Sequence, residues 1–247
     1  MARGAPDDSN IKVEGILHGV HELGELAVRL GSPAGWGRSG NLLYADTFKD
    51  GLGKGVVSGT GSGDYGVLEN GSWAVDGVAL KITGDGNPEA FYWLVYSLPW
   101  YGSERLGGEV SFSIDNEVKA LGVSMYAYTE DTMLRGTFYY NAVDQYLYSL
   151  AADDSEIVIA SSVRAAYASS PTNVIKLVID PVAGKHSWGQ FNGHVYDLRN
   201  IELVEQAAAF PDTLDVYFVM YEQGSTPASV VLDRVLITTN EGERLDN

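Results

Sequence analysis

From Asn41 to about residue 240, apolar and polar residues alternate along short segments of the chain. A period of two is typical of β-strands that bury one face, and the segments Val78–Thr83, Glu109–Ile114 and Val216–Met220 show it clearly. Clusters of glycine, proline and asparagine separate these segments. The pattern predicts about a dozen short strands, and therefore an all-β sandwich rather than alternating strands and helices.

Three segments depart from simple alternation. Phe91–Leu98 is a continuous apolar run, which predicts a strand buried on both faces. Gly51–Gly66 is rich in glycine and is predicted to be a loop. The phase of Val230–Thr238 breaks around Leu232–Arg234, which predicts a β-bulge.

The clearest local pattern is a three-stranded meander. Ile175–Ile179 alternates, and Asp180–Gly184 has the composition of a turn. The second strand is predicted over His186–Phe191. A tight hairpin turn at Asn192–Gly193 then leads into the third strand, His194–Leu198.

Residues 1–40 have a different character and form a predicted N-terminal arm. Segment 21–30 is the one convincing helix, followed by a C-terminal glycine at Gly31 and a stop at Pro33. Its apolar stripe follows helical spacing and consists of Leu23, Leu26, Ala27 and Leu30. The predicted organisation is therefore the arm 1–40, a sandwich 41–240 and a C-terminal tail 241–247.

A helix of this length is not stable alone in water, so its apolar stripe needs a surface to pack on. Two partners are open: the sandwich of the same chain, or a neighbouring subunit. The working prediction is the neighbouring subunit, with an assembly interface that adds Trp36 of the connector to Leu23, Leu26, Ala27 and Leu30.

Several segments of the predicted sandwich resemble the concanavalin A-like lectin/glucanase jelly roll, especially its laminin-G-like relatives. Asp46–Phe48 resembles the opening strand of that family, Lys176–Asp180 with Phe191–Gly193 its central meander, and Val231–Ile237 its closing strand. The resemblance implies a concanavalin-like jelly-roll sandwich. It leaves function open, because this fold hosts lectins, hydrolases and scaffold modules.

The arm carries a second resemblance. The opening Ala5–Asn10, the Glu25–Ala27 portion of the helix and the glycine-rich connector are similar to segments in structural proteins of tailed-phage particles. This resemblance implies a virion subunit, such as a capsid decoration or a tail-associated protein, that forms a homo-oligomer through its arm.

The composition of the chain limits the classes of partner that the protein is expected to bind. The net charge is −17 and no Lys/Arg cluster occurs, which excludes a typical nucleic-acid binder and disfavours an anionic membrane surface. No apolar run is long enough to span a membrane, and the N-terminus lacks the apolar core of a signal peptide. With no cysteine, disulfides and thiolate chemistry are excluded. We therefore expect the protein to be made in a host cytoplasm and to be located in the virion.

The sequence lacks the catalytic motif of the jelly-roll glycosidases. The resemblance implies Glu-x-Asp-x-x-Glu on one strand, and the nearest segment holds Asp115 and Glu117 where a strand runs into a turn. His186 and His194 flank Trp188 in the meander and are expected to lie in the core or at its rim. The protein is therefore predicted to be non-enzymatic, with a glycoside hydrolase as the third hypothesis.

The cofactor that the resemblance implies is a structural calcium ion where the first and last strands meet. Asp46 and Asp233 lie in those strands and would supply oxygen ligands. Asp85 with Asn87 and Asp153 with Asp154 are alternative clusters.

The alternative to a particle protein is a carbohydrate-binding or adhesin module. Such a module needs exposed aromatic rings beside hydrogen-bonding side chains. Strand alternation places Tyr126, Tyr128 and Tyr139 opposite the core-facing set, so these three are the candidate glycan-binding residues. Packing on a partner subunit is the other role open to them.

Overall fold

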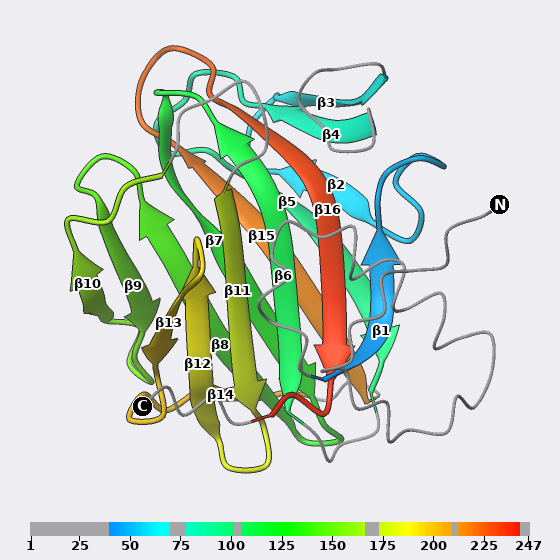
Figure 1. The fold of residues 1–247 in the computed structure, drawn as a ribbon, viewed down its shortest axis with the longest axis vertical. Helices are drawn as coiled ribbons and strands as arrows, with labels where there is room; N and C mark the ends of the chain where they lie inside the picture. Colours follow the sequence, from blue (N-terminus) through cyan, green and yellow to red (C-terminus); the bar gives the residue numbers. More distant parts are fainter. Residues whose placement is uncertain (1–39, 70–77, 101–104, 166–172, 209–211, 243–247) are drawn as a thin grey trace, which may run out of the picture.

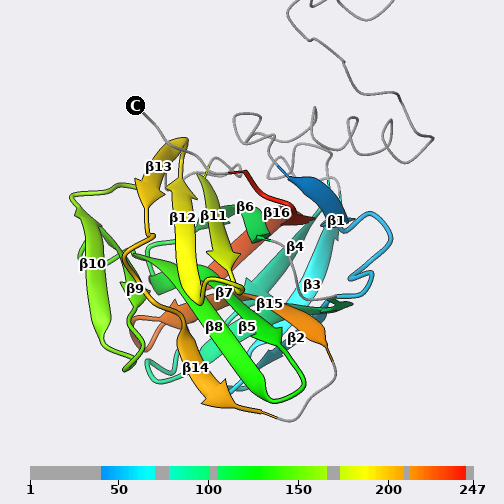
Figure 2. The same ribbon diagram turned by 90° about the horizontal axis from the view of Figure 1, so that it is seen from below.

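The computed structural model describes residues 40–69, 78–100, 105–165, 173–208 and 212–242, which form two antiparallel sheets (Figure 1). Sheet A has the order β13-β12-β11-β6-β16-β4-β3, with β1 also paired to β16. Sheet B has the order β10-β9-β8-β7-β15-β5-β2, with β14 also paired to β8. The sheets stack face to face as the two layers of a sandwich (Figure 2). The prediction of an all-β jelly-roll sandwich is confirmed.

The strands of sheet A are β1 (Asn41–Asp46), β3 (Asp64–Glu69), β4 (Val78–Thr83), β6 (Leu106–Ile114), β11 (Asn173–Asp180), β12 (Lys185–Phe191), β13 (His194–Asp197) and β16 (Ser229–Thr239). Those of sheet B are β2 (Val56–Gly59), β5 (Phe91–Pro99), β7 (Val118–Tyr128), β8 (Thr132–Asn141), β9 (Tyr146–Leu150), β10 (Glu156–Ser161), β14 (Val204–Ala207) and β15 (Thr213–Glu222). None of the described ranges contains a helix long and apolar enough to cross a membrane.

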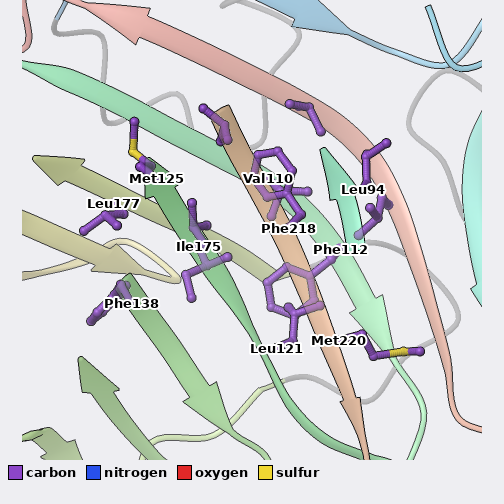
Figure 3. Packing of buried hydrophobic residues seen from close by; sticks show 14 of the residues in the cluster. Leu94, Val110, Phe112, Leu121, Met125, Phe138, Ile175, Leu177, Phe218 and Met220 are labelled. Atoms are coloured by element: carbon purple, nitrogen blue, oxygen red, sulfur yellow. The ribbon is translucent and has the colours of Figure 1, made fainter. Parts of the chain in front are cut away.

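The core lies between the sheets and follows directly from the alternation. One apolar side chain in every two points inward from each strand, and the two inner faces interlock. Figure 3 shows this contact, with side chains of β6 and β11 meeting those of β5, β7, β8 and β15. The buried residues that the figure labels are Leu94, Val110, Phe112, Leu121, Met125, Phe138, Ile175, Leu177, Phe218 and Met220.

The meander and the bulge are where the sequence patterns predict them. β11, β12 and β13 pair in order, and Asn192 and Gly193 both have positive φ in the turn between the last two. The register of β16 against β6 shifts between Leu232 and Arg234, which is the predicted bulge.

The prediction of a loop over Gly51–Gly66 is wrong, because this segment contains β2 and the start of β3. Its glycines make room for an aromatic ring. A Cβ at Gly59 would lie 2.4 Å from Cδ1 of Tyr92, and one at Gly63 would lie 2.5 Å from Cε1 of the same ring. Glycine at these two positions reflects close packing against Tyr92.

The prediction that Phe91–Leu98 is buried on both faces is also wrong. Tyr92, Leu94, Tyr96 and Leu98 are buried in the core, whereas Phe91 and Trp93 on the opposite face are only partly buried. The apolar run is continuous because the outer face of β5 carries aromatic residues.

The predicted helix 21–30, its stripe and Trp36 lie outside the described residues. Strands extend from Asn41 to Thr239. Glu241 of the predicted tail is buried, and its Oε1 lies 2.6 Å from Nζ of Lys176 on β11.

Candidate functional site

The outer face of sheet B carries a second, smaller hydrophobic cluster that is separate from the core. We call it the aromatic face. It is built from side chains on β5, β7, β8, β9 and β15 that alternate with the core-facing set. Its aromatic residues are Phe91, Trp93, Tyr126, Tyr128, Tyr139, Tyr146, Tyr148, Tyr217 and Tyr221.

One series of ring contacts crosses the aromatic face. Tyr139 stacks on Tyr148 with centroids 5.2 Å apart and meets the edge of Tyr221 at 6.0 Å. Tyr221 stacks on Phe91 at 5.6 Å, and Phe91 lies 5.3 Å from Trp93. Aromatic pairs at these separations stabilise one another beyond the area they bury. The rings therefore form a preorganised layer rather than independent side chains.

A second group of rings lies over β7 and β15. Tyr126 stacks on Tyr128 with an interplanar angle of 15° and centroids 6.4 Å apart. The ring of Tyr217 meets Tyr126 edge-on at 4.9 Å. All three side chains are partly exposed, so part of each ring faces solvent.

A row of polar residues runs through this second group. Strand register places Arg135 of β8 opposite Tyr126, Tyr126 opposite Asp215, and Asp215 opposite Ser97 of β5. Adjacent strands lie about 4.8 Å apart, so the row spans about 14 Å. We call Arg135, Tyr126, Asp215 and Ser97 the polar row. It alternates charged or hydroxyl groups with an aromatic ring.

Electrostatics of the polar row follow from partial burial. Burial raises the pKa of the Asp215 carboxyl, and a hydrogen bond with Ser97 opposes this shift. Burial, with the charge of Asp215 nearby, raises the pKa of Tyr217 to about 12, so its hydroxyl stays protonated at neutral pH. Arg135 pairs with Asp154 and keeps 18% of its side chain exposed. The row thus presents a carboxylate acceptor, a guanidinium donor and neutral hydroxyls.

The three predicted glycan-binding residues all lie on the aromatic face, but their positions differ. Tyr126 and Tyr128 are partly exposed, whereas Tyr139 is 5% exposed and its hydroxyl is hydrogen-bonded to Ser124. Burial raises the pKa of Tyr139 well above its usual value. Tyr139 therefore supports the ring layer from below instead of offering a contact surface.

Gly122 explains why the ring of Tyr139 can lie so close to the sheet. A Cβ at Gly122 would lie 2.1 Å from Cδ1 of Tyr139 and 2.5 Å from the Phe138 carbonyl oxygen. We expect Gly122→Ala to lower the free energy of unfolding by about 1–3 kcal/mol, because the ring and backbone must move apart. Urea unfolding would measure the loss. Gly66→Ala is the matched control, since nothing lies within 4 Å of a Cβ there, and an equal loss in both variants would contradict the explanation.

The sequence pattern did not identify Arg135, Asp215, Tyr217 and Tyr221 as parts of this site. The signal for three of them was available, because Val216, Phe218 and Met220 face the core and Asp215, Tyr217 and Tyr221 alternate with them.

The predicted calcium ligands have other structural settings. Asp46 points into the sandwich, where it accepts hydrogen bonds from Tyr96 Oη at 2.9 Å and from the Phe48 amide at 2.8 Å. Asp233 is buried at the bulge of β16. Among the described residues, no cluster of three His, Cys, Asp or Glu side chains could hold a metal ion. Calcium binding by Asp46 and Asp233 stays a prediction, and the observed contacts of Asp46 are structural.

Asp115, which belongs to the segment most similar to a catalytic motif, has a structural role. Asp115 Oδ1 accepts the amide of Glu117, and its Oδ2 accepts the amide of Ser229 at 2.7 Å. This carboxylate closes the turn between β6 and β7 and ties it to β16.

On the aromatic face, the described strands carry Asp215 on β15 and Glu156 on β10, and Asp154 in the turn before β10 is paired with Arg135 of the polar row. Four strand spacings separate β15 from β10 in the order of sheet B, which is about 19 Å. Retaining glycosidases hold their two carboxyl groups about 5–5.5 Å apart, and inverting enzymes about 6.5–9.5 Å. The pair does not match either geometry.

No protein-family model and no curated protein sequence matches this chain. Solved structures that are similar to it include a β-glucanase of Bacillus licheniformis, with 11% identity over 81% of this chain and 99% of the glucanase, at a TM-score of 0.46. The metal-free carbohydrate recognition domain of Emp46p is 11% identical over 83% of this chain and 96% of that domain, at a TM-score of 0.49. A xylan-binding domain from Paenibacillus barcinonensis is 12% identical over 83% of this chain and 97% of its own, at 0.37.

These similarities concern the arrangement of strands. A hydrolase and carbohydrate-binding domains both occur among the three structures, so the likeness does not separate an enzyme from a binding domain. The comparisons give no support to the predicted resemblance to tailed-phage proteins. A particle function, a homo-oligomer and a virion location stay predictions. What the chain shares with its structural neighbours is the concanavalin-like jelly-roll fold.

Proposed function

We propose that this chain is a carbohydrate-binding domain that binds a neutral glycan across the aromatic face, without hydrolysing it. The observation that carries the proposal is the polar row, in which Tyr126 lies between Arg135 and Asp215 and is flanked by the partly exposed rings of Tyr128 and Tyr217.

The chemistry of a sugar fits this arrangement. A pyranose has apolar C–H faces and a rim of hydroxyl groups, so it needs rings for its faces and both donors and acceptors for its rim. Ligand sites combine apolar and aromatic walls with a few placed polar groups in this way. Tyr126 and Tyr217 supply rings, Asp215 supplies an acceptor, and Arg135 supplies a donor.

The charge of the protein favours a neutral ligand. With a net charge of −17 and Asp215 within the row, a polyanionic polysaccharide would be repelled both at long range and at the site. The separation of Asp215 from Glu156, and the pairing of Asp154 with Arg135, support binding rather than hydrolysis.

The experiment that tests the proposal is titration calorimetry of the purified chain with a panel of neutral polysaccharides. Tyr126→Ala removes the ring at the centre of the row, and we expect it to weaken binding by about tenfold or more. Asp215→Asn should weaken binding less, because the amide oxygen can still accept a hydrogen bond. Tyr65→Ala is the matched control, since Tyr65 is 48% exposed on β3 of the other sheet.

Circular dichroism would show that each variant is folded. Failure of the folded wild-type chain to bind any glycan, or equal affinities for wild type and Tyr126→Ala, would overturn the proposal. Release of reducing ends during incubation would contradict the part of the proposal that excludes hydrolysis.

A further inference from the structure

The outer face of sheet A differs from an ordinary solvent-facing sheet surface, because its side chains are buried. This outer face is formed by β6, β11, β12 and β16, whose inward residues fill the core. The outward residues, all less than 9% exposed, are Glu109, Ser111, Ser113, Val174, Lys176, Val178, Trp188, Gln190, Val231, Arg234, Leu236 and Thr238. No strand of the described ranges lies over them (Figure 1).

The pattern of side-chain sizes on this face suits a helix. The outward residues of the central strand β6 are Gly107, Glu109, Ser111 and Ser113, of which all but Glu109 are small. Larger apolar side chains lie on both sides of it, Val174, Val178 and Trp188 on one side and Val231 and Leu236 on the other. Ser111 and Ser113 allow close approach of a backbone over that half of β6, Glu109 pairs with Lys176 of the neighbouring strand, and the flanking apolar residues supply apolar contact.

An ion-pair cluster shows that water is excluded from part of this face. Nζ of Lys176 lies 2.6 Å from Oε1 of Glu241 and 3.9 Å from Oε2 of Glu109, and 5.1 Å from the centre of the Trp188 ring. Burying charges in this manner is costly unless they are paired. Residues 241 and 242 cover one corner, because the Gly242 carbonyl also accepts the Trp188 indole N–H at 3.2 Å.

The chain begins its first strand at this same corner. A Cβ at Gly40 would lie 2.7 Å from the Thr239 carbonyl oxygen and 2.9 Å from Cδ of Glu241. Residues 31–39 connect Gly40 to segment 21–30 and can span at most about 30 Å. From β1 across β16, β6 and β11 to β12 is four strand spacings, or about 19 Å, so the segment can reach every strand of the face.

We propose that the outer face of sheet A is the docking site for residues 21–30 of the same chain, with Leu23, Leu26 and Leu30 packed against it. The short connector gives the segment a high effective concentration at its own face, which favours it over a second copy of the chain. The apolar stripe that needs a partner thus meets a sheet face that is buried and lies within its reach.

Cysteine crosslinking tests the proposal cleanly, because the chain has no cysteine of its own. Leu23→Cys, Leu26→Cys and Leu30→Cys would each be combined with Ser111→Cys on β6 and treated with a short bismaleimide. We expect at least one pair to link within a monomer. Leu26→Cys with Ser97→Cys is the control, because Ser97 is exposed on the outer face of the opposite sheet.

Links between two chains would overturn the proposal in favour of a second copy. Absence of any link to Ser111→Cys in folded protein would overturn it in favour of another segment covering the face.

Limited proteolysis provides a second measurement. Leu26→Asp should speed cleavage within 21–30 by at least tenfold, whereas Val28→Asp, which lies off the stripe, should not. Equal rates in the two variants would also count against docking.

Discussion

Replacing Glu222 with alanine is expected to lower the free energy of unfolding by about 3–5 kcal/mol, enough to remove a large part of the stability of a typical domain. The Glu222 side chain is fully buried at the end of β15. Its Oε1 accepts the amides of Gly86 at 3.1 Å and Ala228 at 2.9 Å, and its Oε2 accepts the amide of Asp85 at 3.2 Å.

The expected loss of stability is large because the Glu222 carboxylate binds two segments that pass from one sheet to the other. Residues 84–90 connect β4 of sheet A to β5 of sheet B, and residues 223–228 connect β15 of sheet B to β16 of sheet A. Alanine would leave three amide donors without their acceptor and open a cavity beside Gly84, where a Cβ would lie 2.0 Å from Oε1 of Glu222.

Urea denaturation would measure the loss, with Glu89→Ala as the control. Glu89 is an exposed glutamate in the same connection, and its replacement should change stability by less than about 0.5 kcal/mol. Glu222→Gln should fall between the two, because the amide keeps one acceptor oxygen but turns a donor toward the backbone amides. A loss of less than about 1 kcal/mol in Glu222→Ala would show that residues 84–90 and 223–228 keep their conformation without the Glu222 carboxylate.

Much of the sandwich could be predicted because its strands alternate. The meander from β11 to β13 has two strong turn signals, and the change of phase near Asp233 marked the bulge of β16. Both features are local, and each is encoded by residues within a few positions of one another. Strand β2 was missed because the glycines at its end and just after it, Gly59 and Gly63, are determined by the ring of Tyr92 on another strand.

The candidate site was only partly predictable for the same reason. Alternation reports which face of a sheet a side chain points to, and it placed Tyr126, Tyr128 and Tyr139 together. It does not report which outward residues are covered by their neighbours. Tyr139 is covered because Gly122 allows its ring to lie flat and Tyr148 and Tyr221 pack on it. That outcome depends on β7, β9 and β15 at once, so no single segment of sequence contains it.

The polar row shows how the fold joins these separate segments. Arg135, Tyr126, Asp215 and Ser97 come from four strands whose order in the sheet is β8-β7-β15-β5. Asp215 is distant in sequence from the other three, yet register places it between Tyr126 and Ser97. The polar row can be changed by substitutions on one strand without altering the core beneath it, which makes the row a direct target for mutation.

A fall in pH from 7 to 4 is expected to destabilise the protein through His186, a core residue of the meander. His186 is buried between the sheets, where Nε2 accepts the Thr137 amide at 3.0 Å and Nδ1 lies 3.2 Å from the Ile201 carbonyl oxygen. These contacts fit a neutral ring protonated on Nδ1, and a proton on Nε2 would face an N–H group. Burial lowers the pKa of His186 to about 4, with the bond to Ile201 opposing this shift.

The direction of the effect follows from comparing the two states. Above pH 6.5 the ring is neutral in both the folded and the unfolded chain, and its contribution to stability is complete. Between pH 6.5 and about 4 the unfolded chain takes up a proton that the folded chain refuses, so stability falls, and the loss levels off at about 3 kcal/mol below that range. Carboxylates such as Asp85 and Asp197, whose pKa values are lowered to about 2 by hydrogen bonds from Ser62 and Arg199, contribute at lower pH.

Urea denaturation at a series of pH values would isolate this contribution. Wild type should lose stability steeply between pH 6.5 and 4, while His186→Gln should show a flatter profile, because glutamine can pair with Thr137 and Ile201 without titrating. His194→Gln, which changes an exposed histidine on β13, should retain the wild-type slope. If His186→Gln and wild type were to fall in parallel over this range, the pH dependence would belong to other groups, and His186 would have to be reached by solvent in the folded chain.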